Sequence, residues 1–185
     1  MSEEVMTCLD RYLKDRTAES FLALRTAFAA QPGYAPYARD PGEASRLIRE
    51  KKFAEAREFI MSVMGNWMLN PGMHVMAHLA FKELGEEHEA EMENKWAALI
   101  MEGILSTGDG TQEHPYRVLF VADEYDVLMR LGKKPAVQLL VTGPYGPCDL
   151  QECEDGSSVY FDISVPISHL DRSPAVRKKW WQFWK

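Results

Sequence analysis

The amino-acid sequence predicts an α+β protein in which paired helices come first and a small antiparallel sheet with one helix follows. Apolar residues recur with helical spacing through the first 105 residues. Two small residues in that region, Ala56 and Ala90, lie 34 positions apart, as in repeated helical hairpins. After Ser106 the apolar residues instead form short runs between glycine-rich turns. We therefore expect a helical region over 1–105, a β-rich region over 106–170 and a tail over 171–185.

The helical region contains clear start and stop signals. Ser2 can cap a helix whose first turn holds Glu3 and Glu4. Pro32-Gly33 ends the second helix, and Asp40-Pro41 offers a cap and a first-turn proline for the third. We expect six helices, which begin near Ser2, Thr17, Asp40, Phe53, Asn70 and Glu87 and extend at the last to Leu105.

The β-rich region is predicted to run in the order β-α-β-β-β. Asp123 can cap a short helix that Gly132 ends. Gly143 to Pro147 forms a turn, and Glu154 to Ser157 forms another. The four predicted strands are Tyr116–Val121, Ala136–Thr142, Cys148–Cys153 and Val159–Val165.

Two hairpins, Pro41 to Trp67 and Pro71 to Leu105, resemble tetratricopeptide repeats. Ala56 and Ala90 each follow a turn residue, Lys51 or Gly85, by five positions, where a small side chain lets the helices approach. The resemblance implies a concave, peptide-binding face on the second hairpin. The residues that would form it are Val75, Leu79, Lys82 and Glu83.

A series of short motifs follows in a specific order between Phe21 and Val165. They are Gln31-Pro32-Gly33-Tyr34-Ala35-Pro36-Tyr37, Leu84-Gly85, Gly108-Asp109-Gly110, Tyr116-Arg117-Val118, Glu124-Tyr125, Leu131-Gly132 and Val159-Tyr160-Phe161-Asp162-Ile163. In their order and spacing they resemble an uncharacterised bacterial family, domain of unknown function 4919. This resemblance implies the fold and assigns no activity.

Composition excludes several classes of protein. The chain has 185 residues, and none of its apolar runs reaches the roughly 20 residues that span a bilayer. The first ten residues are polar and acidic, unlike a signal peptide, and three cysteines fit a reducing compartment. We expect a cytoplasmic protein. Residues 1–170 hold 16 basic and 27 acidic residues, a charge of −11, which argues against nucleic acid as a partner.

His74 and His78 lie one helical turn apart, a spacing that can hold a metal if a third ligand such as His88 joins them. We favour the interpretation that one histidine packs at the helix interface and the other is exposed. Cys148 and Cys153 could form a redox pair, but in one strand they point to opposite faces, so we expect free thiols.

Two acidic motifs have both a chemical and a structural interpretation. Gly108-Asp109-Gly110 could bind phosphate or calcium, but it lacks the rest of either motif and is typical of a turn. Asp123, Glu124 and Asp126 could serve as acid and base, but at a helix start they are expected to cap the helix and interact with its dipole.

The tail over 171–185 differs from the rest of the chain. It holds five basic residues and one acid, a charge of +4, and four of its last six residues are aromatic. We expect it either to dock in a partner or to attach weakly to the anionic inner face of the membrane, rather than to pack on the domain. The docking residues would be Lys178, Lys179, Trp180, Trp181, Phe183 and Trp184.

The pattern as a whole favours a non-catalytic protein-interaction or adaptor protein, with another protein as partner and no cofactor or metal. Two alternatives stay open. The first is a toxin-neutralising immunity protein, which is suggested by small size and acidity. The second is a small-ligand binder or enzyme with a pocket between the helical and β parts, near Tyr116 and Tyr125.

Overall fold

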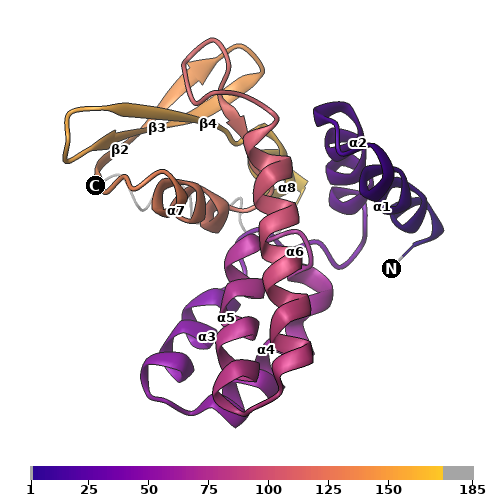
Figure 1. Ribbon diagram of the computed structural model, residues 1–185. Coiled ribbons are helices and arrows are strands. Elements are labelled where there is room, and N and C mark those ends of the chain that lie inside the picture. Colours follow the sequence, from indigo (N-terminus) through magenta and orange to yellow (C-terminus); the bar gives the residue numbers. More distant parts are fainter. Residues whose placement is uncertain (1, 173–185) are drawn as a thin grey trace.

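A computed structural model describes residues 2–172, which form eight helices and one four-stranded sheet (Figure 1). The α+β prediction is confirmed, with helices before residue 106 and the sheet after it. The six helices of the first part are α1 (Glu3–Asp15), α2 (Ala18–Ala29), α3 (Asp40–Arg49), α4 (Phe53–Trp67), α5 (Pro71–Glu83) and α6 (Glu87–Leu105).

Side-chain caps begin several of these helices where the sequence predicted. The Ser2 hydroxyl accepts the Val5 N–H at 3.4 Å, and the Asn70 side chain accepts the Met73 N–H at 2.8 Å. Asp40 is the exception: it lies inside α3, and its carboxylate accepts the Trp67 indole N–H at 2.8 Å. Asp40 therefore ties α3 to the end of α4 and does not cap its own helix.

The turns α3–α4 and α5–α6 have the same backbone geometry 34 residues apart. Lys51 and Gly85 both adopt a left-handed conformation, with φ of 57° and 76°. The next N–H in each turn returns to a carbonyl five residues earlier, at 3.0 Å from Lys52 to Leu47 and at 2.9 Å from Glu86 to Phe81. The repeat is therefore present in the structure, while its assignment to the tetratricopeptide family stays a prediction.

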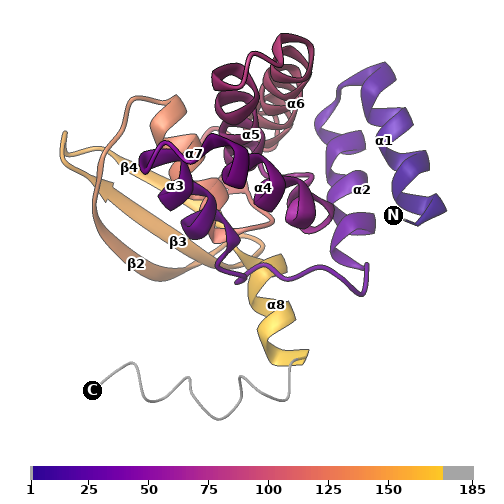
Figure 2. The same ribbon diagram turned by 90° about the horizontal axis from the view of Figure 1, so that it is seen from below.

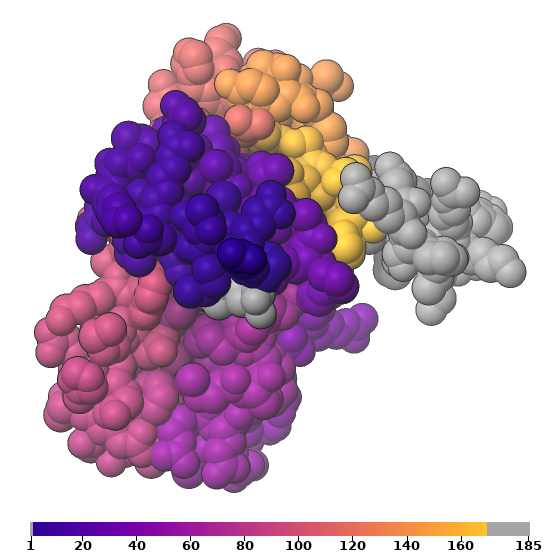
Figure 3. Space-filling model, turned by 90° about the vertical axis from the view of Figure 1, so that its right-hand side faces the viewer, coloured from indigo at the N-terminus to yellow at the C-terminus, as the bar shows by residue number. Residues whose placement is uncertain are grey.

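The hairpin α1–α2 docks on the C-terminal half of α6. The Tyr12 hydroxyl donates to the Leu99 carbonyl at 2.8 Å, and both groups are buried. Gly103 of α6 lies against the ring of Phe21, so close that a Cβ would be 2.4 Å from that ring. In Figure 3 the hairpin (indigo) lies over the junction of the helical region (magenta) and the sheet (orange and yellow).

The four strands lie in the order β1-β4-β3-β2. Pairing of β2 with β3 and of β3 with β4 is antiparallel, as predicted, but β1 pairs in parallel with β4, so the sheet is mixed. The strands are β1 (Tyr116–Arg117), β2 (Pro135–Gly143), β3 (Gly146–Cys153) and β4 (Ser158–Asp162), with α7 (Val121–Arg130) between β1 and β2.

The predicted first strand, Tyr116–Val121, ends after two residues because side chains take over its backbone groups. Arg25 and Tyr34 donate to the carbonyls of Val118 and Leu119. The Asp123 carboxylate accepts the N–H groups of Leu119 and Phe120 at 2.9 and 3.0 Å. The segment 118–120 is therefore buried, and side chains satisfy backbone groups that a neighbouring strand would otherwise bind.

The predicted last strand, Val159–Val165, ends at Asp162, where a helix begins that the sequence did not predict. The Asp162 carboxylate accepts the Ser164 N–H at 2.9 Å at the start of α8 (Ser164–Arg172). Its other oxygen accepts from Arg117 at 3.0 Å. The expected boundary between the β-rich region and the tail, at residue 170, therefore falls inside α8.

Phe120 joins the two halves of the core. Its ring stacks on the indole of Trp67, with centroids 4.5 Å apart, and meets the rings of Phe28 and Tyr34. Each ring comes from a different segment, so this aromatic cluster fixes α2, α4 and the start of α7 relative to one another.

Candidate functional site

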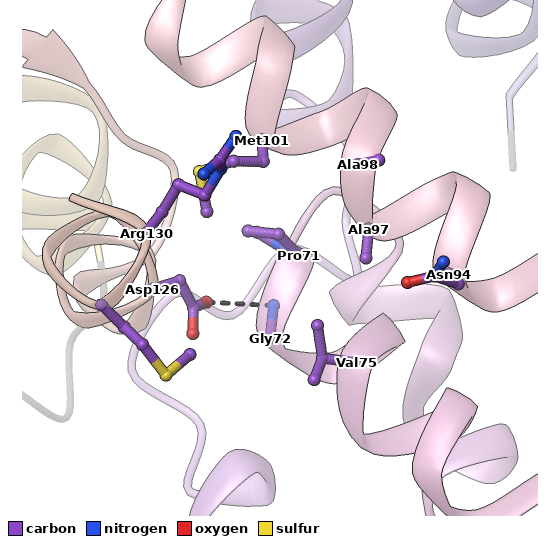
Figure 4. Close-up of a pocket in the computed structure, with 10 residues that line it drawn as sticks. Pro71, Gly72, Val75, Asn94, Ala97, Ala98, Met101, Asp126 and Arg130 are labelled. Carbon is purple, nitrogen blue, oxygen red and sulfur yellow. Dashed lines mark hydrogen bonds between the residues drawn. The ribbon is translucent and has the colours of Figure 1, made fainter. Parts of the chain in front are cut away.

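A pocket of about 310 Å³ opens where α5, α6 and α7 meet (Figure 4). Because α7 belongs to the β-rich region, the pocket lies between the helical and β parts of the chain. It is lined by Pro71, Gly72 and Val75 of α5, by Asn94, Ala97, Ala98 and Met101 of α6, and by Asp126, Met129 and Arg130 of α7.

The first turn of α5 brings α7 close enough to form one wall. The backbone N–H of Gly72 donates to Asp126 at 3.0 Å, and the Asn70 side chain donates to the same oxygen at 2.9 Å. A Cβ on Gly72 would lie only 2.5 Å from the Asp126 carboxylate. Glycine at this position therefore allows the direct contact between α5 and α7.

Small and apolar side chains shape the rest of the pocket. Ala97 and Ala98 leave space on the α6 side, and Val75 and Met101 supply apolar surface. Arg130, at the end of α7, is exposed and forms no ion pair with any side chain of residues 2–169. The pocket can hold an apolar group of a ligand and has a cation beside it.

Burial raises the pKa of the two carboxyls held by Asn70. The pKa of Asp126 is raised to about 6, and that of Asp123 to about 7, because desolvation disfavours the charged forms. Asn70 donates to Asp123 at 2.7 Å and partly offsets this effect. The second oxygen of Asp126, Oδ1, accepts from no described residue, so it can accept a hydrogen bond from a ligand.

A second acidic pair lies between α7 and the sheet. Glu124 and Asp149 are both buried, and desolvation, together with the negative charge of Asp149, raises the pKa of Glu124. Gln151 donates to Glu124 at 2.8 Å, and Gln138 donates to Asp149 at 2.6 Å. The Glu124 Oε1 atom has no N–H or O–H donor among the described residues.

Comparison with protein-family models gives a match over residues 10–172 to a domain of unknown function, DUF4919. The chain belongs to the DUF4919 family. The match covers most of the chain and carries no activity. No curated protein and no solved structure gives a match. Within residues 2–172 of this DUF4919 protein, no helix is long and apolar enough to cross a membrane.

The pocket contains one of the four residues that the sequence predicted for partner binding. Val75 lines it, while Leu79, Lys82 and Glu83 are exposed further along α5 and do not. Val75, Leu79 and Lys82 are spaced by four and three residues, so they share one face of the helix. The predicted tail residues Lys178, Lys179, Trp180, Trp181, Phe183 and Trp184 lie outside the described residues.

The three carboxylates at the start of α7 do not share one role. Asp123 accepts the N–H groups of Leu119 and Phe120, but it lies in the first turn of α7 and not at the cap position that was predicted. Glu124 lies in the first turn of α7, as expected, and its carboxyl faces β3. Asp126 instead contacts the N-terminus of α5, which was not predicted. The sequence could not show this, because Asn70, Gly72 and Gln151 are distant along the chain.

Both ring nitrogens of His74 already have partners. They lie 2.5 Å from a Glu93 carboxylate oxygen and 2.9 Å from the Met68 carbonyl, and the ring is buried. His78 is half-buried, where full exposure was expected, and contacts the Ala90 carbonyl at 2.8 Å. Over residues 2–172 no group of three or more His, Cys, Asp or Glu is placed to hold a metal.

The remaining motifs have structural roles in the DUF4919 fold. Cys148 and Cys153 are free and buried. Gly110 has φ of 81° in a turn that the Asp109 carboxylate stabilises by accepting from Thr111 at 3.0 Å. Tyr116 packs on Phe161, and Tyr125 is exposed on α7, so neither of the tyrosines expected near a ligand lines the pocket.

Proposed function

We propose that this DUF4919 protein binds another protein and that the pocket between α5, α6 and α7 receives an apolar side chain of that partner. The observation that carries the proposal is the composition of the pocket. Its walls are largely apolar, Asp126 Oδ1 is an open acceptor at its edge, and the exposed cation Arg130 lies beside it. A peptide offers a matching set: an apolar side chain, a backbone N–H and an acidic neighbour.

The exposed face of α5 extends the proposed surface beyond the pocket. Leu79, Lys82 and Glu83 continue from Val75 along the helix, as expected for a partner-binding face in a tetratricopeptide-like hairpin. A short groove of this kind gives modest affinity unless a second contact adds to it. The basic aromatic tail is our candidate for that second contact, either on the same partner or on a membrane surface.

A substitution that fills the pocket tests the proposal. Ala98 is exposed on α6, so Ala98→Phe places a ring over the pocket without altering the core. The matched control is Ala54→Phe, the same change at an exposed alanine of α4 outside the pocket. Protein purified gently from its host should carry a stoichiometric partner in the wild type and in Ala54→Phe, but not in Ala98→Phe. Equal partner recovery in all three proteins would contradict the proposal.

A small-ligand function is the second candidate, because the pocket lies between the helical and β parts and is largely apolar. Native mass spectrometry separates the two functions. A bound molecule of a few hundred daltons in the wild type and Ala54→Phe, absent in Ala98→Phe, would favour the small ligand. A bound polypeptide with the same dependence would favour the protein partner.

A further inference from the structure

The edge strand β2 has a backbone row that no described residue covers. The strand order places β2 at one edge of the sheet, next to β3 alone. In Figure 2 the sheet lies on the opposite side of the molecule from α1 and α2, with β2 at its outer side. Apolar residues Val137, Leu139 and Leu140 are 43–49% exposed along it. An apolar edge of this length is rare on a protein that functions alone.

The register shows which backbone groups of β2 are open. Two backbone hydrogen bonds show which residues of β3 face β4. The Ile163 N–H donates to the Pro147 carbonyl at 3.1 Å, and the Cys153 N–H donates to the Ser157 carbonyl at 2.8 Å. Alternation along β3 therefore directs Cys148, Leu150 and Glu152 toward β2. These residues are opposite Val141, Leu139 and Val137.

The alternate residues of β2 consequently direct their N–H and C=O groups to the open edge. They are Gln138, Leu140 and Thr142, and no described backbone group bonds to them. The set is symmetric about Leu140. Two antiparallel copies of it can pair Leu140 with Leu140, and Gln138 with Thr142 in both directions. All three residues of each copy then exchange backbone hydrogen bonds with the partner.

The charge along β2 also fits a second copy. Pro135 to Gly143 contains no Lys, Arg, Asp or Glu, although the whole chain has a charge of −7. Edge strands are commonly protected by charges, prolines or bulges. Here the only such features, Pro135 and the register shift before Val137, lie at one end and leave Val137 to Thr142 unprotected. The charges of a charged peptide would meet no residue of opposite charge on β2, whereas the β2 strand of a second copy is equally uncharged.

We propose that two copies of this chain pair through β2 in an antiparallel, two-fold arrangement centred on Leu140, which makes one continuous sheet across the dimer. On the outer face Leu139 of each copy would then lie opposite Val141 of the other, and these apolar side chains would contact one another across the dimer. The inference is independent of the pocket, which lies on the helical side of α7.

Sedimentation velocity and amide hydrogen exchange of the full chain test the proposal. We expect the mass to double with rising concentration, and the amides of Gln138, Leu140 and Thr142 to become protected in parallel. The amides of Val137, Leu139 and Val141 bond to β3, so they should be protected at all concentrations. A monomer at every concentration overturns the proposal. Protection of the first three amides in a monomer also overturns it and indicates that another part of the chain covers the edge.

Leu140→Pro removes the central N–H without removing a β2–β3 hydrogen bond, because that N–H faces the open edge. Each copy loses one donor, so association should weaken by roughly tenfold or more. The matched control Leu140→Thr keeps the N–H and should still dimerise, though more weakly. A Leu140→Pro protein that dimerises as tightly as wild type overturns the proposal. If this variant does not fold, the amide exchange of the wild type decides.

Discussion

Lys51 and Gly85 hold the same left-handed position in the two helical hairpins, 34 residues apart, with φ of 57° and 76°. Both turns close with a hydrogen bond from the following residue to a carbonyl five residues earlier. One turn uses glycine, which adopts this conformation freely, and the other uses a residue with a Cβ. The turn at Lys51 therefore stores strain that the turn at Gly85 avoids.

Opposite substitutions in the two turns should consequently have opposite effects. Lys51→Gly should raise the free energy of unfolding by up to about 1 kcal/mol, and Gly85→Ala should lower it by about 1–2 kcal/mol. Urea denaturation of both variants measures this. Destabilisation of similar size in both would show that the two turns are not equivalent.

The close approach of α5 and α7 predicts the effect of a methyl group at Gly72. In Gly72→Ala the new Cβ would push the Asp126 carboxylate away from the Gly72 N–H and from Asn70, so we expect a net loss of about 1 kcal/mol. The control is Gly65→Ala in α4, where nothing lies within 4 Å of the added methyl group. That variant should gain about 0.5–1 kcal/mol, because alanine favours the helix. Chemical denaturation that ranks Gly72→Ala as stable as Gly65→Ala would contradict the contact.

The raised pKa values of Asp123 and Asp126 predict how stability depends on pH. Folding raises both above their unfolded values, so the folded state binds more protons between about pH 4 and pH 7. This contribution is fully present below about pH 4 and is lost as the pH rises through the folded values of about 6 and 7. Urea denaturation should therefore show greater stability at about pH 5 than at about pH 8.

Asp126→Asn should reduce that difference by roughly 1–3 kcal/mol, because it removes one of the two titrations. Asp155→Asn is the control: Asp155 is exposed and contacts Lys133 and Ser157, which hold the pKa of its carboxyl below the usual range. It titrates at lower pH and should leave the difference unchanged. An unchanged difference in Asp126→Asn would mean that Asp126 is already charged at about pH 5.

Ala90 is 2% exposed at the interface of α5 and α6, and its carbonyl contacts His78. Ala90→Leu should overpack this interface and cost about 1–3 kcal/mol. The control Ala54→Leu places the same side chain at an exposed position of α4 and should change stability little. Identical thermal unfolding of Ala90→Leu and the wild type would show that the interface can accommodate the larger side chain.

The basic aromatic tail is expected to attach the protein weakly to anionic membranes. Arg177, Lys178, Lys179 and Lys185 would each contribute about 1 kcal/mol near such a surface, and the acidic body would oppose them. Sedimentation with anionic vesicles at low salt should retain the full chain and release a chain that ends at Val176. Equal, negligible binding of both would contradict attachment to the membrane.

The local rules of the sequence predicted the helices well and the contacts of the site poorly. Asn70 was expected to begin α5, and its side chain caps Met73 as a local pattern can show. Its other side-chain atom bonds to Asp123 and Asp126, which lie 53 and 56 residues later. No periodicity reports such a contact, so the raised pKa values and the pocket were beyond prediction. The first strand was overextended for the same reason, since Arg25 and Tyr34 replace a strand partner there.

The bonds of Arg25 and Tyr34 to the segment 118–120 also bear on synthesis of the chain. The Arg25 side chain donates to the Val118 carbonyl, 93 residues downstream. A ribosome synthesises Val118 only about 5–20 s after Arg25. Until then the Arg25 guanidinium and the Tyr34 hydroxyl have no acceptor on the segment 118–120. The Trp67 ring also cannot yet stack on the Phe120 ring. The nascent helical half is therefore incomplete until the start of α7 has been translated. We therefore expect folding of the two halves to be completed together, after the start of α7 has been synthesised, and truncated translation products to be less stable than the full chain.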